Sequence, residues 1–150
     1  AFFLIDEGWP IYTHPRFLPA TQISNTYLED TLIAEGCWIE NADIREAVVG
    51  LRSQIRSGCK LKRTIMMGAD YYGFFRRGRE EEGDQMLGLG QDCDIEGAIL
   101  DKNTSIGRGT VIRPFPGVED LETELYSVRD GIVVIPKGTI IPPGTVIAPE

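Results

Sequence analysis

Aliphatic side chains recur along the first half of the chain at a spacing of five or six residues. Between Leu32 and Met67 they stand at Ile33, Ile39, Ile44, Val49, Ile55, Leu61 and Met66 or Met67. An amphipathic helix would repeat about every 3.6 residues and an amphipathic strand about every 2 residues. A short fixed period is instead typical of repeat proteins, and a period of about six indicates a parallel β-helix. We therefore expect this stretch to form the first block of a solenoid of stacked coils.

The same spacing returns later in the chain, from Leu89 onward. The aliphatic positions of this second block are Leu89, Ile95, Ile99 or Leu100, Ile106 and Ile112. The last block, Gly131–Pro149, holds two successive hexads of one form, Ile135-Pro-Lys-Gly-Thr-Ile and Ile141-Pro-Pro-Gly-Thr-Val. The pattern predicts an all-β protein, a hexapeptide-repeat solenoid that forms a parallel β-helix over residues 21–150.

Two insertions interrupt this predicted solenoid. Residues 73–86 carry arginines followed by a run of acidic side chains, a segregation of charge that is typical of a solvated loop or a short exposed helix. The second interruption runs from Arg113 to Asp130 and contains two prolines and an acidic segment. We predict loops at both places and give the first no catalytic role.

Residues 1–20 do not carry the repeat. Three prolines alternate there with apolar side chains between Trp9 and Pro19, a composition that favours an extended linker. The chain starts at Ala1 without a methionine or a positively charged leader. We expect a fragment of a longer protein.

The net charge limits the classes of partner that this chain is expected to bind. The net charge is −8, from 15 basic and 23 acidic residues, which argues against nucleic acid or an anionic membrane surface as a partner. No apolar run reaches the length of about 18 residues that a transmembrane helix needs. An acidic chain can still hold a local basic pocket for a small anion.

Three cysteines, Cys37, Cys59 and Cys93, each follow an aliphatic corner residue by four positions. Three threonines hold the same offset in other coils, namely Thr110, Thr139 and Thr145. We interpret the cysteines as small core residues with reduced thiols, as expected in the cytosol. A metal site or a disulfide is the alternative, but the spacing offers no CxxC or Cys/His pattern.

The fold by itself does not decide the function, and the usual chemistry of such solenoids is missing. Many hexapeptide acyltransferases use a histidine base between coils, and a carbonic-anhydrase-type β-helix needs three histidines for its zinc. The single histidine, His14, precedes the repeats. No glycine-rich phosphate loop occurs either. The chain alone therefore has no evident catalytic set.

Five segments nevertheless carry a resemblance, in order, to one enzyme family. The chain resembles the C-terminal part of ADP-glucose pyrophosphorylases, the glucose-1-phosphate adenylyltransferases of glycogen and starch synthesis, in their cyanobacterial and plant form. The segments are Trp9–Pro19, Val48–Ser53, Met66–Tyr72, Ala98–Asn103 and Gly131–Lys137.

This resemblance implies a left-handed parallel β-helix that packs on a catalytic domain, contributes to a homotetramer and helps to bind anionic effectors. The effectors of the family are activators such as 3-phosphoglycerate, opposed by phosphate. ATP, Mg²⁺ and the catalytic residues belong to an N-terminal domain that this chain lacks, so we assign it no catalytic residue, metal or cofactor and expect it to be inactive alone. The expected location is the cytoplasm, or a plastid in a plant or alga.

The resemblance also implies an effector site. Lys102 and Lys137 match two lysines of the family that are implicated there, and Arg16 matches an anion-contacting arginine. His14 stands where plant-type sequences have glutamine. Asp101 either orients Lys102 or acts as a turn residue. Convergent cations of this kind suit a phosphate or carboxylate, although each could be an ordinary exposed charge.

Two other functions remain open at this point. One is a stand-alone hexapeptide transferase with its groove between subunits, which a histidine within the coils would favour. The other is a purely structural solenoid that mediates oligomerisation.

Overall fold

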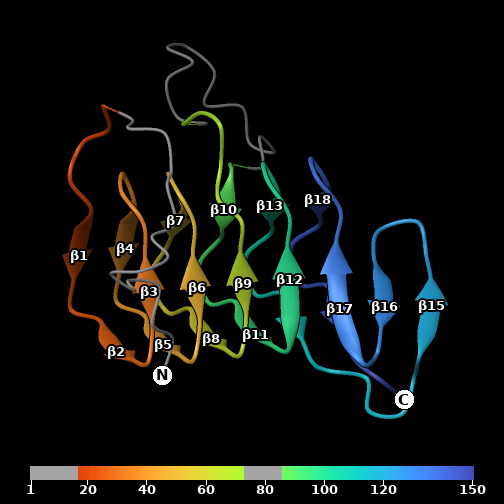
Figure 1. Ribbon diagram of the computed structural model, residues 1–150. Helices are drawn as coiled ribbons and strands as arrows, with labels where there is room; N and C mark the ends of the chain where they lie inside the picture. Colours follow the sequence, from red (N-terminus) through yellow and green to blue (C-terminus); the bar gives the residue numbers. More distant parts are fainter. Residues whose placement is uncertain (1–16, 73–85) are drawn as a thin grey trace, which may run out of the picture.

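The computed structural model describes residues 17–72 and 86–150, and every regular element in these two ranges is a short β-strand. The strands form three sheets, here called sheets A, B and C (Figure 1). Sheet A consists, in spatial order, of β1 (Gln22–Ser24), β4 (Trp38–Glu40), β7 (Gln54–Ile55), β10 (Gly88–Leu89), β13 (Ser105–Ile106) and β18 (Ile140–Ile141). Sheet B consists of β2 (Tyr27–Glu29), β5 (Asp43–Arg45), β8 (Lys60–Lys62), β11 (Asp94–Glu96), β14 (Val111–Ile112) and β19 (Val146–Ile147). Sheet C consists of β3 (Leu32–Ile33), β6 (Val48–Val49), β9 (Ile65–Met66), β12 (Ala98–Leu100), β17 (Ile132–Ile135), β16 (Ser127–Arg129) and β15 (Asp120–Glu122).

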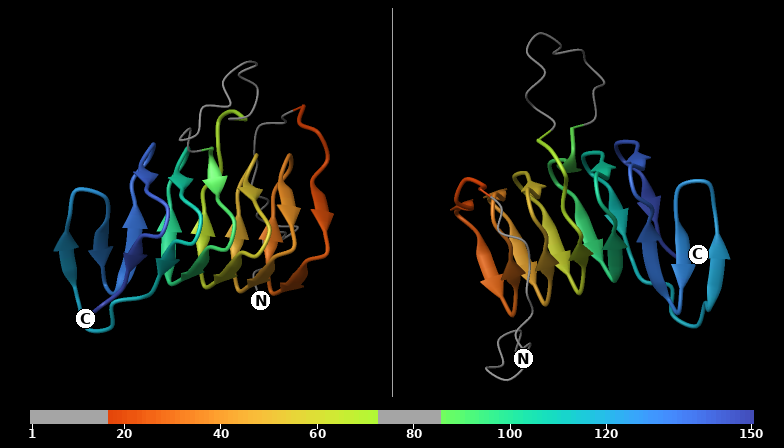
Figure 2. Two further views of the ribbon diagram at one scale, coloured as in Figure 1. Left: turned by 180° about the vertical axis from the view of Figure 1, so that it is seen from behind. Right: turned by 45° about the horizontal axis from the view of Figure 1, so that its top comes forward.

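The first four coils each contribute one strand to each sheet, so the chain climbs a three-sided prism (Figure 2). The fifth coil adds β15 and β16 to sheet C beside β17, and the last coil contributes β18 and β19 to sheets A and B. Strands of successive coils pair in parallel, as β4 does with β7 and β5 with β8. The three coil corners of the prism are the A–B, B–C and C–A corners, named by the sheets they connect. The predicted parallel β-helix is confirmed.

The repeating aliphatic positions form the core. On sheet A, for example, Ile39 pairs with Ile55, Ile55 with Leu89, and Leu89 with Ile106, and all four side chains are buried. A side chain of this size contributes roughly 1.5–3 kcal/mol when it is fully buried. The corresponding buried side chains of sheets B and C are Ile44, Leu61, Ile95, Ile112, Ile147, Val49, Met66, Leu100 and Ile135.

Small residues fill the inward positions at the corners and bind the carbonyl groups there. The Thr110 Oγ1 donates a hydrogen bond to the Gly107 oxygen at 2.6 Å, and the Cys93 Sγ donates to the same oxygen at 3.3 Å. The three cysteines are buried and not disulfide-bonded. Burial raises the pKa of the Cys37 thiol. The interpretation of the cysteines as small core residues is confirmed.

The second insertion differs from the predicted loop. Its strands β15 and β16 form an antiparallel hairpin that extends sheet C beyond β17 (Figure 1). Thr123 closes the hairpin turn, since its Oγ1 donates to the Tyr126 oxygen at 2.8 Å and accepts from the Tyr126 N–H at 3.0 Å. Phe115 and Val128 are buried in the main core, so this insertion packs against the C-terminal end of the solenoid.

The opposite end of the solenoid is more open. Ile23 and Leu28 occupy inward positions in the first coil, yet they are 42% and 40% exposed because no earlier coil covers them in the described part of the chain. Residues 17–20 have no regular structure. Most of the predicted linker over residues 1–20, and residues 73–85 of the first insertion, lie outside the described residues.

Candidate functional site

The candidate site lies at the C–A corner, where three consecutive strands of sheet C end side by side. Met66 of β9 pairs with Leu100 of β12, which in turn pairs with Ile135 of β17. Lys102 and Lys137 therefore occupy equivalent positions, two residues beyond the ends of adjacent strands. Successive coils lie about 4.8 Å apart, so the regular stacking alone makes these two lysines neighbours.

Asp70 lies between the two lysines. Its Oδ1 is 3.4 Å from the Lys102 Nζ, and its Oδ2 is 4.0 Å from the Lys137 Nζ. Asn103 fixes this carboxylate from the next coil, because its Nδ2 donates to Oδ2 at 3.1 Å and its Oδ1 accepts from the Asp70 N–H at 2.8 Å. The hydrogen bond from Asn103, followed by that from Lys102, holds the pKa of Asp70 below its ordinary value.

Asp101 contributes to the turn that carries Lys102. Its Oδ1 accepts the backbone N–H of Lys102 at 2.6 Å. Asn103 follows in the left-handed region with a φ of 60°, which asparagine tolerates better than most residues. This geometry favours the turn role among the two that the sequence left open, while the Lys102 ammonium is directed by Asp70.

A further cation lies one coil earlier at the same corner. Arg52 follows β6, and its Nη1 donates to the Ala69 oxygen at 3.1 Å. Neither Arg52 nor Asp70 was predicted as a site residue. A signal was present for Asp70, because it lies within the Met66–Tyr72 segment that carries the family resemblance.

The predicted site residues Arg16 and His14 lie outside the described residues. In the described part of the linker, Leu18 lies at the C–A corner of the first coil, beside Gly36. The Tyr72 hydroxyl donates to the Gly36 oxygen at 2.7 Å on the same corner. The linker thus meets the solenoid along the edge that carries Lys102 and Lys137, several coils away from them.

The charges of this corner are exposed and only weakly paired with one another. The side chains of Asp70, Lys102 and Lys137 are 47%, 42% and 61% exposed, and surface ion pairs of this kind contribute little to stability. A phosphate or carboxylate can therefore displace Asp70 at low cost and take both ammonium groups. No group of His, Cys, Asp and Glu side chains that could hold a metal ion occurs in ranges 17–72 and 86–150.

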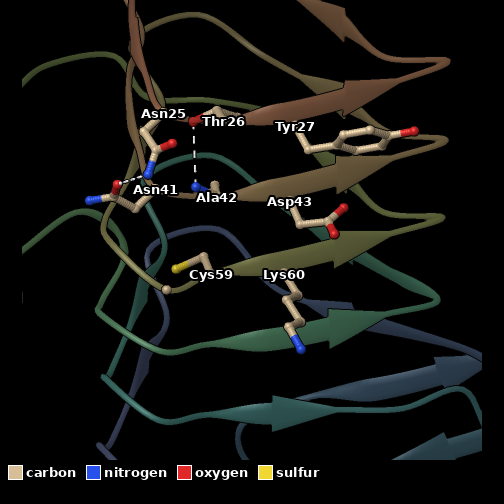
Figure 3. Close-up of a pocket in the computed structure, with 9 residues that line it drawn as sticks. Asn25, Thr26, Tyr27, Asn41, Ala42, Asp43, Cys59 and Lys60 are labelled. Carbon is tan, nitrogen blue, oxygen red and sulfur yellow. Dashed lines mark hydrogen bonds between the residues drawn. The ribbon is translucent and has the colours of Figure 1, made fainter.

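A second groove, at the A–B corner, belongs to the scaffold of the solenoid. It encloses about 450 Å³ and is open to solvent, with Tyr27, Asp43 and Lys60 along one side (Figure 3). Asparagine side chains stack along its wall, since the Asn25 Nδ2 donates to the Asn41 Oδ1 at 2.7 Å. These amides satisfy one another and stabilise the corner.

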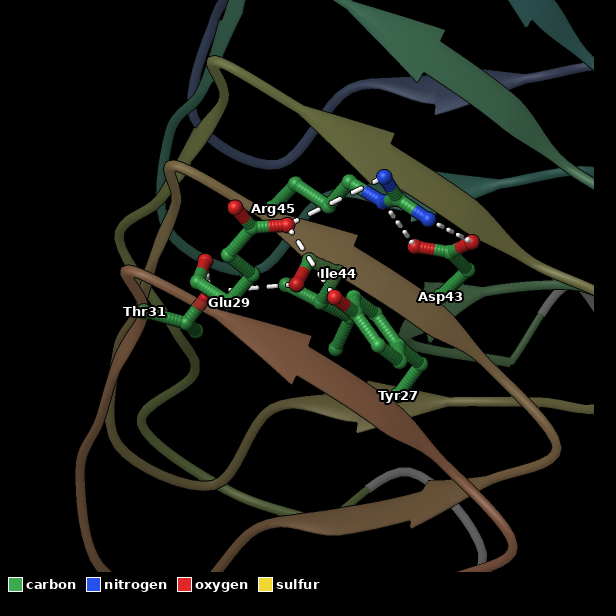
Figure 4. Close-up of polar contacts among 6 residues, drawn as sticks. All are labelled: Tyr27, Glu29, Thr31, Asp43, Ile44 and Arg45. Atoms are coloured by element: carbon green, nitrogen blue, oxygen red, sulfur yellow. Dashed lines mark hydrogen bonds and ion pairs between the residues drawn. The ribbon is translucent and has the colours of Figure 1, made fainter.

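The outer face of sheet B carries a network of charges next to that groove. The Arg45 guanidinium binds Asp43 through two hydrogen bonds of 2.8 and 3.2 Å and lies 4.6 Å from the centre of the Tyr27 ring (Figure 4). Glu29 lies 3.8 Å from the same guanidinium. Each charge has an internal partner, so the network is a stabilising feature of the sheet surface.

No helix in the described part of the chain is long and apolar enough to cross a membrane.

Comparison with known proteins matches residues 16–146 to the family described as the GLGC left-handed parallel beta-helix domain. The chain is also 39% identical, over 150 aligned residues, to the chloroplastic/amyloplastic small subunit of glucose-1-phosphate adenylyltransferase from Triticum aestivum.

That alignment covers 97% of this chain but only 32% of the wheat protein, so the chain spans about a third of its relative's length. The family match covers nearly all of the solenoid and agrees with the parallel coils of the structure. The chain therefore belongs to the left-handed parallel β-helix domain family of the glucose-1-phosphate adenylyltransferases.

Proposed function

We propose that this chain is the regulatory and assembly domain of a glucose-1-phosphate adenylyltransferase and that it binds an anionic effector at the C–A corner. The observation that carries the proposal is the approach of Lys102 and Lys137, from adjacent coils, to the two oxygens of Asp70. An anion with phosphate or carboxylate oxygens replaces Asp70 and bridges the coils. A 3-phosphoglycerate-like activator has both groups, and inorganic phosphate would compete for the same ammonium groups.

In the parent enzyme, the activity would be the conversion of ATP and glucose 1-phosphate to ADP-glucose and diphosphate. A preceding domain would supply the nucleotide site and Mg²⁺, and this chain alone is inactive. The resemblance adds Arg16 and His14, from the linker that meets the same edge of the solenoid at Leu18, to the residues proposed to contact the effector. The parent enzyme would be a homotetramer, located in a plastid or in the cytoplasm according to its source.

The test uses the full-length enzyme with Lys102→Ala and Lys137→Ala. Each substitution should weaken activation by 3-phosphoglycerate while the turnover without activator stays close to that of the wild type. Lys60→Ala, an exposed lysine of sheet B, is the matched control. An unchanged activator response in both variants would contradict the site.

A second measurement separates effector binding from a purely structural role. The 150-residue chain is heated with and without 3-phosphoglycerate. Effector binding predicts a concentration-dependent rise in melting temperature that both lysine substitutions abolish. A purely structural solenoid predicts no change in melting temperature. In a separate assay, formation of ADP-glucose by the chain alone would refute its assignment as an inactive fragment.

A further inference from the structure

The outer face of sheet A holds a groove that the effector site does not use. It encloses about 230 Å³ and is lined by side chains of three coils, among them Trp38, Gln54, Arg56 and Met86. Trp38 pairs with Gln54 across β4 and β7, so the indole stands directly beside the glutamine. Lys102 and Lys137 do not line this groove.

Gln54 is the first unusual feature of the groove. Its neighbour Ile55 points into the core, so Gln54 stands on the outer face of β7, yet it is only 5% exposed. Its Oε1 accepts a hydrogen bond from the Arg56 Nη2 at 3.1 Å, which fixes the orientation of the amide. Its Nε2 is then a buried donor without a hydrogen-bond partner in the described structure. A buried donor in this state is costly unless an acceptor meets it.

Arg56 is the second unusual feature. Its Nη1 donates to the backbone oxygens of Leu87 and Leu89 at 3.1 and 3.0 Å, so the guanidinium lies across β10. Gly88 lets β10 lie close against β7, because a side chain there would collide with the backbone of Gln54. Burial lowers the pKa of Arg56, which reflects a charge that has lost water.

The charge of Arg56 has no counterion among residues 17–72 and 86–150. No carboxylate there lies within ion-pair distance of its guanidinium. Glu40 also lines the groove, but its Oε1 accepts a hydrogen bond from the Trp38 Nε1 at 2.8 Å. A partly buried cation without a carboxylate is unfavourable, and an incoming anion relieves it.

We propose that this groove binds the carboxylate of a small organic acid, held by Arg56 and the Gln54 Nε2, with the apolar part of the acid against Trp38 and Met86. Arginine has five N–H donors, and the described hydrogen bonds of Arg56 occupy three of them. The remaining N–H donors of Arg56 and the Gln54 Nε2 all require acceptors. The two coplanar oxygens of a carboxylate supply such acceptors. Glu40 on the same wall disfavours a ligand with more than one negative charge.

The probe is benzoate, with neutral benzamide as its match in size and shape. The ¹⁵N-labelled 150-residue chain is titrated while the side-chain signals of Trp38 and Gln54 are followed. Benzoate should give saturable shifts of both signals, and benzamide should bind at least about tenfold more weakly because it has no negative charge and only one acceptor oxygen, so it cannot form the bidentate ion pair. Equal binding of both probes, or no saturable shift with benzoate, would overturn the proposal.

Substitutions then locate the binding. Gln54→Glu places a carboxylate beside Arg56 and should abolish benzoate binding while the chain remains folded. Gln54→Met, which removes the unpartnered amide without adding charge, should weaken binding and serves if the glutamate variant does not fold. Arg108→Gln, an exposed arginine outside the groove, is the control and should bind normally. Wild-type affinity in both Gln54 variants would refute the site.

Two further variants test whether a free acid is the natural occupant of this groove. Lys102→Ala should leave the affinity for benzoate unchanged, because the inference does not rest on the proposed effector site. A loss of benzoate binding in this variant would overturn the proposal for the groove. The sequence also contains an acidic run, Glu80–Glu82, shortly before Met86. A chain with these glutamates changed to glutamine should bind benzoate with unchanged affinity. A gain of about tenfold or more would mean that the chain's own carboxylates compete for Arg56, and would overturn the assignment to a free acid.

Discussion

Lys102 and Lys137 approach opposite oxygens of the Asp70 carboxylate, at 3.4 and 4.0 Å, from equivalent turns of adjacent coils. Asp70 itself comes from the coil below that of Lys102, so three coils meet in one small cluster. Only the stacking of the solenoid brings them together. The cluster is exposed and has an internal anion, Asp70, which the proposed effector would displace in an exchange of anions.

This exchange predicts that Asp70→Asn increases the affinity for an anionic effector. Asparagine removes the competing charge and retains the size of the side chain. We expect binding of 3-phosphoglycerate to tighten by about two- to fivefold, the range that follows from losing one weak surface ion pair. Calorimetric titration of the wild-type and variant chains measures the change. Asp43→Asn, on sheet B, is the control, and a weaker affinity in Asp70→Asn would contradict the exchange.

The ion pair between Asp43 and Arg45 predicts a small pH-dependent contribution to the free energy of unfolding. The hydrogen bond from Arg45 holds the pKa of Asp43 below its ordinary value of 3.8. Because the folded-state pKa is the lower one, this pair stabilises the fold above the unfolded-state pKa and loses its effect as the pH falls through the folded-state pKa. The stability difference between wild type and Asp43→Asn should therefore shrink as the pH falls from about 5 to 2. Urea unfolding at several pH values checks this, and a constant difference would refute the role of the carboxylate.

The repeat predicted the core well because each aliphatic residue at the spacing of five or six points inward from one of the three sheets. Ile39, Ile55 and Leu89 are adjacent for that reason alone. The family resemblance, and not the spacing, selected Lys102 and Lys137, and neither singled out Asp70 as the partner that contacts both. Asp70 follows its strand by a longer turn than either lysine does, so its position depends on the local path of residues 67–70. The second insertion was predicted as a loop because β15 and β16 do not carry the repeat, so the spacing gives no sign that they pair with each other and with β17.

The corner threonines predict which substitutions the inner positions accept. Thr110 is fully buried, and its hydroxyl binds the Gly107 oxygen. Thr110→Val keeps the shape but weakens the pairing of that oxygen, which should cost about 1–2 kcal/mol. Thr110→Cys should cost less, because Cys93 occupies the matching position of the previous coil and donates to the same oxygen. Urea unfolding of both variants gives the comparison, and an equal cost would show that the hydrogen bond is unimportant.

The packing of the second insertion predicts that it stabilises the whole solenoid. Phe115 is 6% exposed and belongs to the main core, and its ring lies 6.3 Å from that of Tyr126. Phe115→Ala should lower the free energy of unfolding by about 3–5 kcal/mol, as expected for an aromatic side chain removed from a core. Leu125→Ala, at the exposed tip of the hairpin, should change it by less than about 0.5 kcal/mol. Chemical unfolding followed by circular dichroism measures both variants. If Phe115→Ala were as mild as Leu125→Ala, the insertion would be an appended loop, whereas the large loss would establish it as the cap of the C-terminal end.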